Sequence, residues 1–170
     1  MTALRRLVPA DLDAFYALRL RALATDPDAF LRTHAEELAR GSGHCARMLF
    51  DVAGNAIFAG VADDLTLVGM AGVYREPPEK WRHKATIWGV FVAAAARGQG
   101  LGGRLMDAAI RHARDAFGVR QVHLSAEAEH HAAIRLYASR GFVAWGTEPR
   151  GTMADGRAMD EVHMWLDLSR

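Results

Sequence analysis

Apolar positions near the start of the chain repeat at the spacing of a helix. The residues that form this stripe are Leu12, Phe15, Tyr16, Leu20 and Leu23. Because such a stripe buries one face of a helix, we expect a helix that opens after Pro9 and stops at Asp26-Pro27. Apolar residues at positions 4–8 predict a short strand before it. The chain therefore opens with a strand and a helix.

The segment after this helix carries one clear start signal and one ambiguous stretch. Thr33 is followed three residues later by Glu36, a capping-box pattern that predicts a helix from residue 34 to about residue 41. The apolar residues of segment 44–53 are spaced so that they fit either a short helix or a strand. Both assignments stay open for this segment.

The rest of the chain alternates strand and helix patterns. Runs of apolar and β-branched residues predict strands at residues 56–61, 65–74, 84–92, 119–126, 142–147 and 161–168. Helical periodicity predicts helices at residues 99–117 and 130–140. Pro77-Pro78 marks a loop at residues 76–82, and the polar residues 148–160 separate the closing strands. This mixture predicts an α+β fold around one mixed sheet, as a single domain over residues 1–170.

Composition and charge exclude several classes of protein. Of the 170 residues, 51% are hydrophobic and 24% are charged, a balance typical of a globular protein with ample material for a core. The formal net charge is +1, with scattered Arg and only two Lys, which argues against nucleic acid or an acidic membrane surface as a partner. No apolar run reaches membrane length, and the lone Cys45 cannot form an internal disulfide. We therefore expect a cytoplasmic protein.

A glycine-rich turn between a predicted strand and a predicted helix is the sharpest feature of the sequence. It consists of Arg97, Gly98, Gln99, Gly100, Leu101, Gly102 and Gly103. Glycines let a ligand come close to the backbone, and the first N–H groups of a helix lack intrahelical partners and lie at the positive end of its dipole. A diphosphate fits such a turn, and Arg97 adds a full positive charge beside it. A simple tight turn does not need so many glycines, because glycine disfavours continuation into a helix.

A diphosphate site alone does not identify the ligand. Gly98, Gly100 and Gly103 also match the G-x-G-x-x-G pattern of dinucleotide-binding enzymes, with Glu127 at the end of the next strand. Against a nicotinamide enzyme, residues 93–97 separate the strand from the first glycine, and only 43 residues follow Glu127, too few for a second mononucleotide half. A P-loop is excluded because no Gly-Lys-Ser/Thr closes the turn.

These residues resemble the GCN5-related N-acetyltransferase (GNAT) superfamily. Arg97, Gly100 and Gly102 match its phosphate-binding motif, Arg/Gln-x-x-Gly-x-Gly/Ala, and residues 132–142 are similar to its Ala…Leu-Tyr…Gly-Phe helix. The order of predicted elements resembles that fold from residue 4 to residue 168. The resemblance implies a twisted, mostly antiparallel sheet of about seven strands flanked by about four helices. It also implies that the sheet splays apart at a bulge between its fourth and fifth strands.

The resemblance implies a set of residues that would hold acetyl-CoA as co-substrate. Backbone groups of Val90, Phe91 and Val92 would bind the pantetheine arm and polarise the thioester carbonyl, while the glycine-rich turn would bind the diphosphate. Tyr137 matches the tyrosine that faces the sulfur, and a hydroxyl with a pKa of about 10 can protonate the leaving thiolate. His130 stands where the family often has Asn, on the helix face of Tyr137, so it would either bind the pantetheine arm or be solvated. No metal-ligand spacing is present, so no metal is expected.

The sequence leaves the general base open. Many members of the superfamily carry a Glu on the strand before the motif, but residues 85–89 hold no carboxylate. Glu127 is the first choice because it ends the strand that lines the predicted gap; Glu129, His163 and a water chain are the alternatives. An amine that arrives neutral needs no strong base.

The expected acceptor is the primary amine of a small molecule or an amino acid, acetylated by direct attack. Two alternatives stay open: a protein N-terminal or lysine acetyltransferase, and a non-catalytic acyl-CoA sensor. The closing strands offer free edge groups through which two copies can pair as a homodimer. For the acceptor, an aromatic wall can form from Trp81, His83 and Trp88. Arg150 and Arg157 can clamp a carboxylate, and Glu148 can hold an ammonium group.

Overall fold

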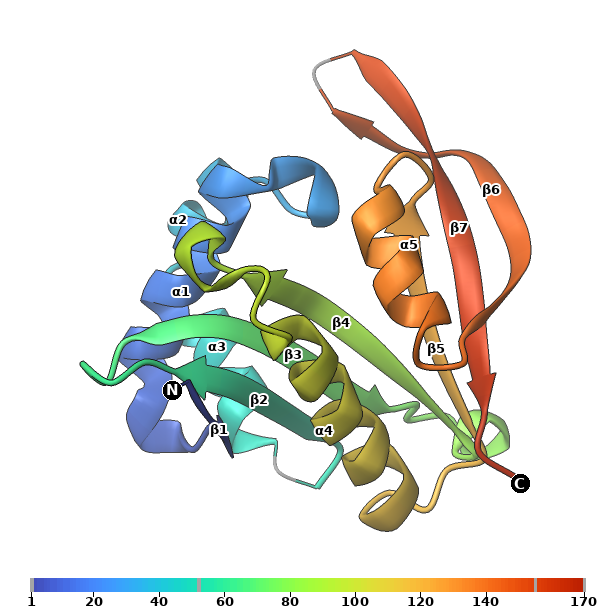
Figure 1. Ribbon diagram of the computed structural model, residues 1–170, viewed down its shortest axis with the longest axis horizontal. Helices are drawn as coiled ribbons and strands as arrows, with labels where there is room; N and C mark the ends of the chain where they lie inside the picture. The colour runs from blue at the N-terminus through green and yellow to red at the C-terminus, as the bar shows by residue number, and fades with distance from the viewer. Residues whose placement is uncertain (1, 52, 155, 170) are drawn as a thin grey trace.

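One seven-stranded sheet organises the molecule (Figure 1). The computed structural model describes residues 2–51, 53–154 and 156–169. The strands lie in the order β1-β2-β3-β4-β5-β7-β6 and are antiparallel except for the parallel β4–β5 pair. Their bounds are Ala3–Arg6 (β1), Asn55–Val61 (β2), Leu67–Arg75 (β3), Lys84–Val92 (β4), Gln121–Glu127 (β5), Val143–Ala154 (β6) and Arg157–Asp167 (β7).

Helices cover both faces of this sheet. The described residues contain the α-helices Leu12–Thr25 (α1), His34–Arg40 (α2), Gly43–Phe50 (α3), Leu101–Asp115 (α4) and His131–Ala138 (α5). Apolar side chains of α1 and α3 pack on one face of β2, β3 and β4, and those of α4 pack on the opposite face. These are five helices where the resemblance implied about four. The additional helix is α3, so the ambiguous segment is helical over residues 44–50.

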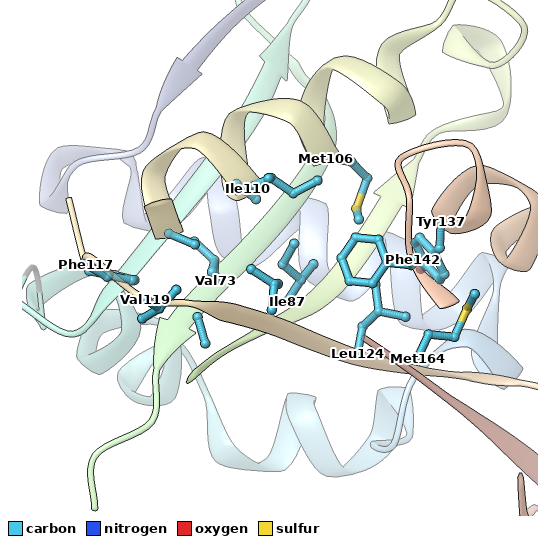
Figure 2. Packing of buried hydrophobic residues seen from close by; sticks show 14 of the residues in the cluster. Val73, Ile87, Met106, Ile110, Phe117, Val119, Leu124, Tyr137, Phe142 and Met164 are labelled. Atoms are coloured by element: carbon cyan, nitrogen blue, oxygen red, sulfur yellow. The ribbon is translucent and has the colours of Figure 1, made fainter. Parts of the chain in front are cut away.

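The larger core lies between α4, α5 and the sheet. Figure 2 shows Met106 and Ile110 of α4 above Val73 and Ile87, with Tyr137 and Phe142 packed at the end of the cluster. The core therefore fixes α4 and α5 beside the middle of the sheet.

The second helix, α2, begins as predicted. The Thr33 hydroxyl accepts from the Glu36 N–H at 3.2 Å, and the Glu36 carboxylate accepts from the Thr33 N–H at 2.8 Å.

Strand β4 carries a bulge at the place where the sheet opens. Met70 pairs with Phe91 and Gly72 pairs with Trp88, so Gly89 and Val90 together oppose a single residue of β3. Gly89 has φ +63°, which a residue with a side chain rarely adopts. The parallel pairing of β4 with β5 ends at Thr86 and His123. Beyond these residues the two strands diverge, as Figure 1 shows, which confirms the predicted splay between the fourth and fifth strands.

The closing hairpin is longer than the sequence suggested. The polar stretch 148–160 was expected to be a loop, but β6 and β7 extend through most of it, with Thr152 paired to Met159 and Ala154 to Arg157. The expectation was wrong because most of this part of β6 is exposed, so its residues show no apolar alternation. Among the described residues, no helix is both long enough and apolar enough to cross a membrane.

Candidate active site

A cavity of about 250 Å³ lies in the gap between β4 and β5. Residues of β4, β5 and α5 form its walls, together with Asp26 at the end of α1 and Arg97 of the glycine-rich turn; the other residues of the turn do not line it. The residues proposed from the sequence that line it are Val90, Phe91, Val92, Arg97, Glu127, His130 and Tyr137. One cavity therefore brings together positions that are separated by up to 47 residues of sequence.

The glycine-rich turn presents unpaired N–H groups at the start of α4. Gly98 and Gly100 have φ values of +76° and +72°, so glycine suits both positions. Gly100 precedes the helix, and the hydrogen-bond ladder of α4 begins where the Arg104 N–H donates to the Gly100 carbonyl at 3.1 Å. The preceding N–H groups of α4 have no intrahelical partner, and the helix dipole makes this end attractive to an anion. The turn has the geometry of a diphosphate site.

The other glycines of the turn lie in close packing contacts. A Cβ at Gly103 would overlap the Arg140 guanidinium, and a Cβ at Gly102 would stand 3.2 Å from Leu136 of α5. These two glycines therefore let α4 and α5 approach closely. Because Gly102 and Gly103 have no side chains, the turn can lie close to α5. Gly98 and Gly100 instead provide the left-handed backbone conformation of the turn.

Arg97 is held by two contacts at the mouth of the cavity. Its Nε donates to the Val92 carbonyl at 2.8 Å, and its Nη2 lies 2.6 Å from the carboxylate of Asp26 at the end of α1. Asp26 also lines the cavity, and no sequence pattern had singled it out for this role. An incoming diphosphate would compete with Asp26 for the guanidinium.

Tyr137 lies at the inner end of the cavity. The residue is 7% exposed, and its ring centroid lies 6.3 Å from that of Phe142. Figure 2 shows the two rings side by side. Burial raises the pKa of the Tyr137 hydroxyl to about 12. We find no hydrogen bond to this hydroxyl within the described part of the chain. The hydroxyl is therefore protonated and available to a ligand in the gap.

His130 lies in the same cavity as Tyr137. It precedes the first residue of α5, and the seven-residue spacing predicted that the two side chains share a side of the helix. Its side chain makes no capping hydrogen bond to α5. The structure therefore brings His130 and Tyr137 to the same gap.

Glu127, the last residue of β5, contributes a largely buried carboxylate. Its side chain is 9% exposed, and the Arg157 guanidinium lies 3.3 Å from it and 2.8 Å from Glu129. Arg157 is therefore paired with two carboxylates, in contrast to the free clamp suggested by the sequence. The third candidate base, His163, lies on β7 and hydrogen-bonds Glu148 at 3.0 Å.

The predicted aromatic wall does not form. Trp81 is 54% exposed and its ring lies 5.4 Å from the Lys84 ammonium, while His83 is exposed. Of the three, Trp88 lines the gap between β4 and β5, and Trp81 and His83 do not. Its indole lies over Gly72, where a Cβ would overlap the ring, and the Arg19 guanidinium lies 5.9 Å from its centroid. Trp88 thus stands on the α1–α3 face of the sheet, one residue before the bulge.

Comparison with known proteins agrees with this geometry. A family model described as the acetyltransferase (GNAT) family matches residues 19–142. A mycothiol acetyltransferase of Brachybacterium faecium is 32% identical over 139 residues, which are 81% of this chain and 39% of the relative. One from Paenarthrobacter aurescens is 31% identical over 149 residues, or 86% and 44%. The chain thus spans less than half the length of these curated relatives.

Solved structures share the same fold over nearly the whole chain. A ribosomal-protein-alanine N-acetyltransferase from Brucella melitensis has a TM-score of 0.80 and 28% identity, covering 98% of this chain and 99% of that one. The structure of yncA from Salmonella typhimurium with its cofactor acetyl-CoA also has a TM-score of 0.80, at 23% identity, covering 100% and 95%. The family match includes the glycine-rich turn and Tyr137. The chain therefore belongs to the GNAT family of acetyltransferases, enzymes that use acetyl-CoA as their co-substrate.

Proposed function

We propose that the chain transfers the acetyl group of acetyl-CoA to the primary amine of a small molecule or an amino acid. The observation that carries this proposal is the gap that brings the β4 bulge, Arg97 of the glycine-rich turn and Tyr137 together, directly before the unpaired N–H groups at the start of α4. In this gap a diphosphate site and a proton donor flank a stretch of free strand backbone. These are the parts that a thioester-dependent acyl transfer requires.

The backbone of β4 supplies polar groups for the thioester. Because pairing with β5 ends at Thr86, the β5-facing N–H and C=O groups farther along β4 have no ladder partner on that side. Val90, Phe91 and Val92 lie in this stretch and line the gap. The amine nitrogen attacks the thioester carbon, and an N–H of this stretch stabilises the oxyanion that forms.

Tyr137 is the proposed proton donor to the leaving sulfur. When the carbon–sulfur bond breaks, the electron pair stays on sulfur and the phenol proton moves to it. The raised pKa of Tyr137 means that the resulting phenolate is strongly basic. It recovers a proton from the still positively charged nitrogen of the acetylated product, which leaves the neutral amide, or from solvent, and this restores the starting state.

Glu127 is the proposed base for an acceptor that arrives as an ammonium ion. Its carboxylate lines the same gap as Tyr137 and is mostly shielded from solvent. The amine must lose its proton before attack, since an ammonium has no lone pair. A carboxylate reaching the gap directly, or through one water, can accept that proton.

A second candidate is acetylation of a protein N-terminus. The specific observation in its favour is the 28% identity to the Brucella enzyme, whose name gives a ribosomal-protein alanine as its target. Short peptides beginning with Ala, assayed beside free amines and amino acids, distinguish the two candidates. Preferred turnover of peptides by at least tenfold in kcat/KM would replace the small-molecule proposal.

The decisive experiment measures acetyl-CoA binding by calorimetry and amine-dependent thiol release with Tyr137→Phe. We expect the variant to bind acetyl-CoA like the parent and to lose about 10²–10⁴-fold in kcat, the usual contribution of a general acid. Tyr16→Phe, a tyrosine of α1 outside the gap, is the matched control and should keep full activity. Binding without turnover of any amine in the parent would instead support the acyl-CoA sensor.

Two predictions from the sequence belong to this proposal. A cytoplasmic location rests on the lone Cys45, which is buried and has no disulfide partner. A homodimer rests on the free edge of β6, the outermost strand of the sheet. Sedimentation velocity of the purified chain at several concentrations tests the second prediction.

A further inference from the structure

A second and larger cavity, of about 680 Å³, lies on the α1–α3 face of the sheet. It is bounded by α3, the start of β2, the end of β3 and the loop before β4. We call it the α3-side cavity, and the residues used below are Arg47, Met48, Tyr74, Arg75, Arg82 and Trp88. Its volume suits a small organic molecule. The proposed acetyl-CoA site does not account for it, because the glycine-rich turn borders the other cavity.

Trp88 stands between the two cavities. It lines both of them, and its indole packs with the α1–α3 cluster, whereas neighbouring Ile87 packs with the α4 cluster. The next residue along β4 is Gly89, where the bulge begins. Because successive residues of a strand are about 3.3 Å apart, Trp88 lies only a few residues along β4 from the stretch proposed to hold the thioester. Its side chain lies on the face of the sheet opposite α4.

The charged side chains that line the α3-side cavity differ in whether a neighbouring group already hydrogen-bonds them. Two carboxylates line it, but Asp51 accepts from the Gly54 N–H at 3.3 Å and Glu76 accepts from the Thr86 hydroxyl at 2.6 Å. Three arginines line it as well. Arg75 donates its Nε to the Arg82 carbonyl at 3.1 Å.

In the described part of the chain, the guanidinium groups of the other two arginines, Arg47 and Arg82, are not held by a contact of this kind. The guanidinium groups of Arg47 and Arg82 make no ion pair within the described residues, and both side chains are exposed at the rim of the cavity. Guanidinium groups are suited to bidentate binding of carboxylate and related oxyanions. The rim is therefore equipped to bind an acid group, while the interior offers the apolar surfaces of Met48, Tyr74 and Trp88.

We propose that the α3-side cavity is the acceptor subsite, and that the acceptor is a primary amine that also carries an acid group. Arg47 and Arg82 bind the acid group, the body of the molecule packs on Trp88, and the amine points past Trp88 toward the bulge at Gly89. This proposal rests on the proposed function, because it assigns the acceptor class of the same acetyl transfer.

The test compares matched acceptors on matched variants. Each of the twenty amino acids is assayed for thiol release beside its C-terminal amide, which keeps the amine and side chain but lacks the acid group. The best pair is then measured on the parent chain, on Arg47→Gln/Arg82→Gln and on the control Arg111→Gln/Arg114→Gln. The control arginines are exposed residues of α4 that line neither cavity.

We expect the parent to prefer the acid, and the Arg47→Gln/Arg82→Gln variant to lose at least about tenfold of that preference through KM, as expected for lost charge-assisted hydrogen bonds. Its kcat, its acetyl-CoA affinity and its turnover of the amide should stay unchanged, as should all values of the control. A parent that turns over amines but prefers the amide, or a variant that keeps the acid preference, overturns the acceptor assignment while leaving the proposed function intact.

Failure of the proposed function is distinguishable. If no amine is turned over, calorimetric titration of the coenzyme A complex with the same amino acids and amides still reports on the cavity. Binding of the acids that is weakened at least about tenfold in Arg47→Gln/Arg82→Gln supports the subsite without transfer. Absence of such binding overturns it.

Discussion

The two cavities that meet at Trp88 are built in opposite ways. The gap between β4 and β5 is formed largely by three continuous stretches, the bulged part of β4, the end of β5 and the start of α5, with the glycine-rich turn beside it. The α3-side cavity is formed by side chains that come from α3, β2, β3, β4 and the loop before β4. The first uses backbone N–H groups as its donors, and the second uses guanidinium groups.

This difference separates what the family shares from what distinguishes its members. A site made of backbone needs particular residues only where glycine or close packing is required, so it persists through wide sequence variation. A site made of scattered side chains changes with each substitution. The fold and co-substrate are therefore shared by distant relatives, whereas the acceptor must be assigned from this chain's own cavity.

The largest expected effect comes from replacing Arg19. Its guanidinium lies 5.9 Å from the centroid of the Trp88 ring and is also paired with Glu37. Glu37 is fully buried; burial favours its neutral form, but the Arg19 guanidinium at 2.8 Å outweighs this and keeps the pKa of Glu37 below its usual range. Arg19→Met leaves that carboxylate without its partner, and we expect about 3–5 kcal/mol of lost stability at pH 7. Denaturant unfolding measures the loss. Acetyl-CoA affinity of the folded fraction should remain at the parental value.

The pH dependence of the free energy of unfolding tests whether the lost ion pair causes this destabilisation. In the parent, the depressed pKa of Glu37 contributes stability that is present above the unfolded-state pKa and is lost as pH falls through the folded-state pKa. In Arg19→Met, burial favours neutral Glu37, so acidification should reduce the deficit relative to the parent. The double variant Arg19→Met/Glu37→Leu should recover most of the stability at pH 7. A deficit that is equally large at low pH would show that packing, rather than charge, is responsible.

The same contrast explains what the sequence could reveal. The bounds of β4 and the shared position of His130 and Tyr137 followed from local spacing, because period and motif act over a few residues. The Arg97–Asp26 contact joins residues 71 positions apart, and Glu37 is charged yet buried, so hydropathy patterns gave no signal for either. The outer part of β6 was missed because exposure removes the alternation that marks a strand.

A smaller disturbance on the acceptor side is Gly72→Ala. The new Cβ would overlap the Trp88 ring, which is rigid and must shift as a body. We expect about 1–3 kcal/mol of destabilisation and a raised KM for the acceptor, with acetyl-CoA affinity unchanged. Gly43→Ala is the control, since it has negative φ and open space around it, and should be at least as stable as the parent. Weakened acetyl-CoA binding in Gly72→Ala would show that Trp88 also shapes the cofactor gap.

The corresponding change on the cofactor side is Gly100→Ala. Nothing lies within 4 Å of the new Cβ, so the cost comes only from φ +72° and should be about 1–2 kcal/mol. If the turn relaxes to avoid this strain, acetyl-CoA binding must restore it, and affinity should fall by about five- to thirtyfold. Gly118→Ala has φ +64° and equally open surroundings, but lies beyond the far end of α4. It should lose similar stability and keep full affinity; equal affinity losses in both variants would place the effect in global folding.

The smallest expected effect tests the contact that closes the cofactor gap. In Asp26→Asn the carboxylate no longer competes with the diphosphate for Arg97, whose orientation is still set by the Val92 carbonyl. Because the Arg97 side chain is 52% exposed, solvent screens this pair, and acetyl-CoA should bind only about two- to fivefold more tightly. Calorimetry at low and high salt measures the gain, which should shrink at high salt as ions screen the same charges. Weaker binding in Asp26→Asn would mean that the carboxylate orients Arg97 for the diphosphate, and Arg97→Gln would then lose less affinity in the Asp26→Asn background than in the parent.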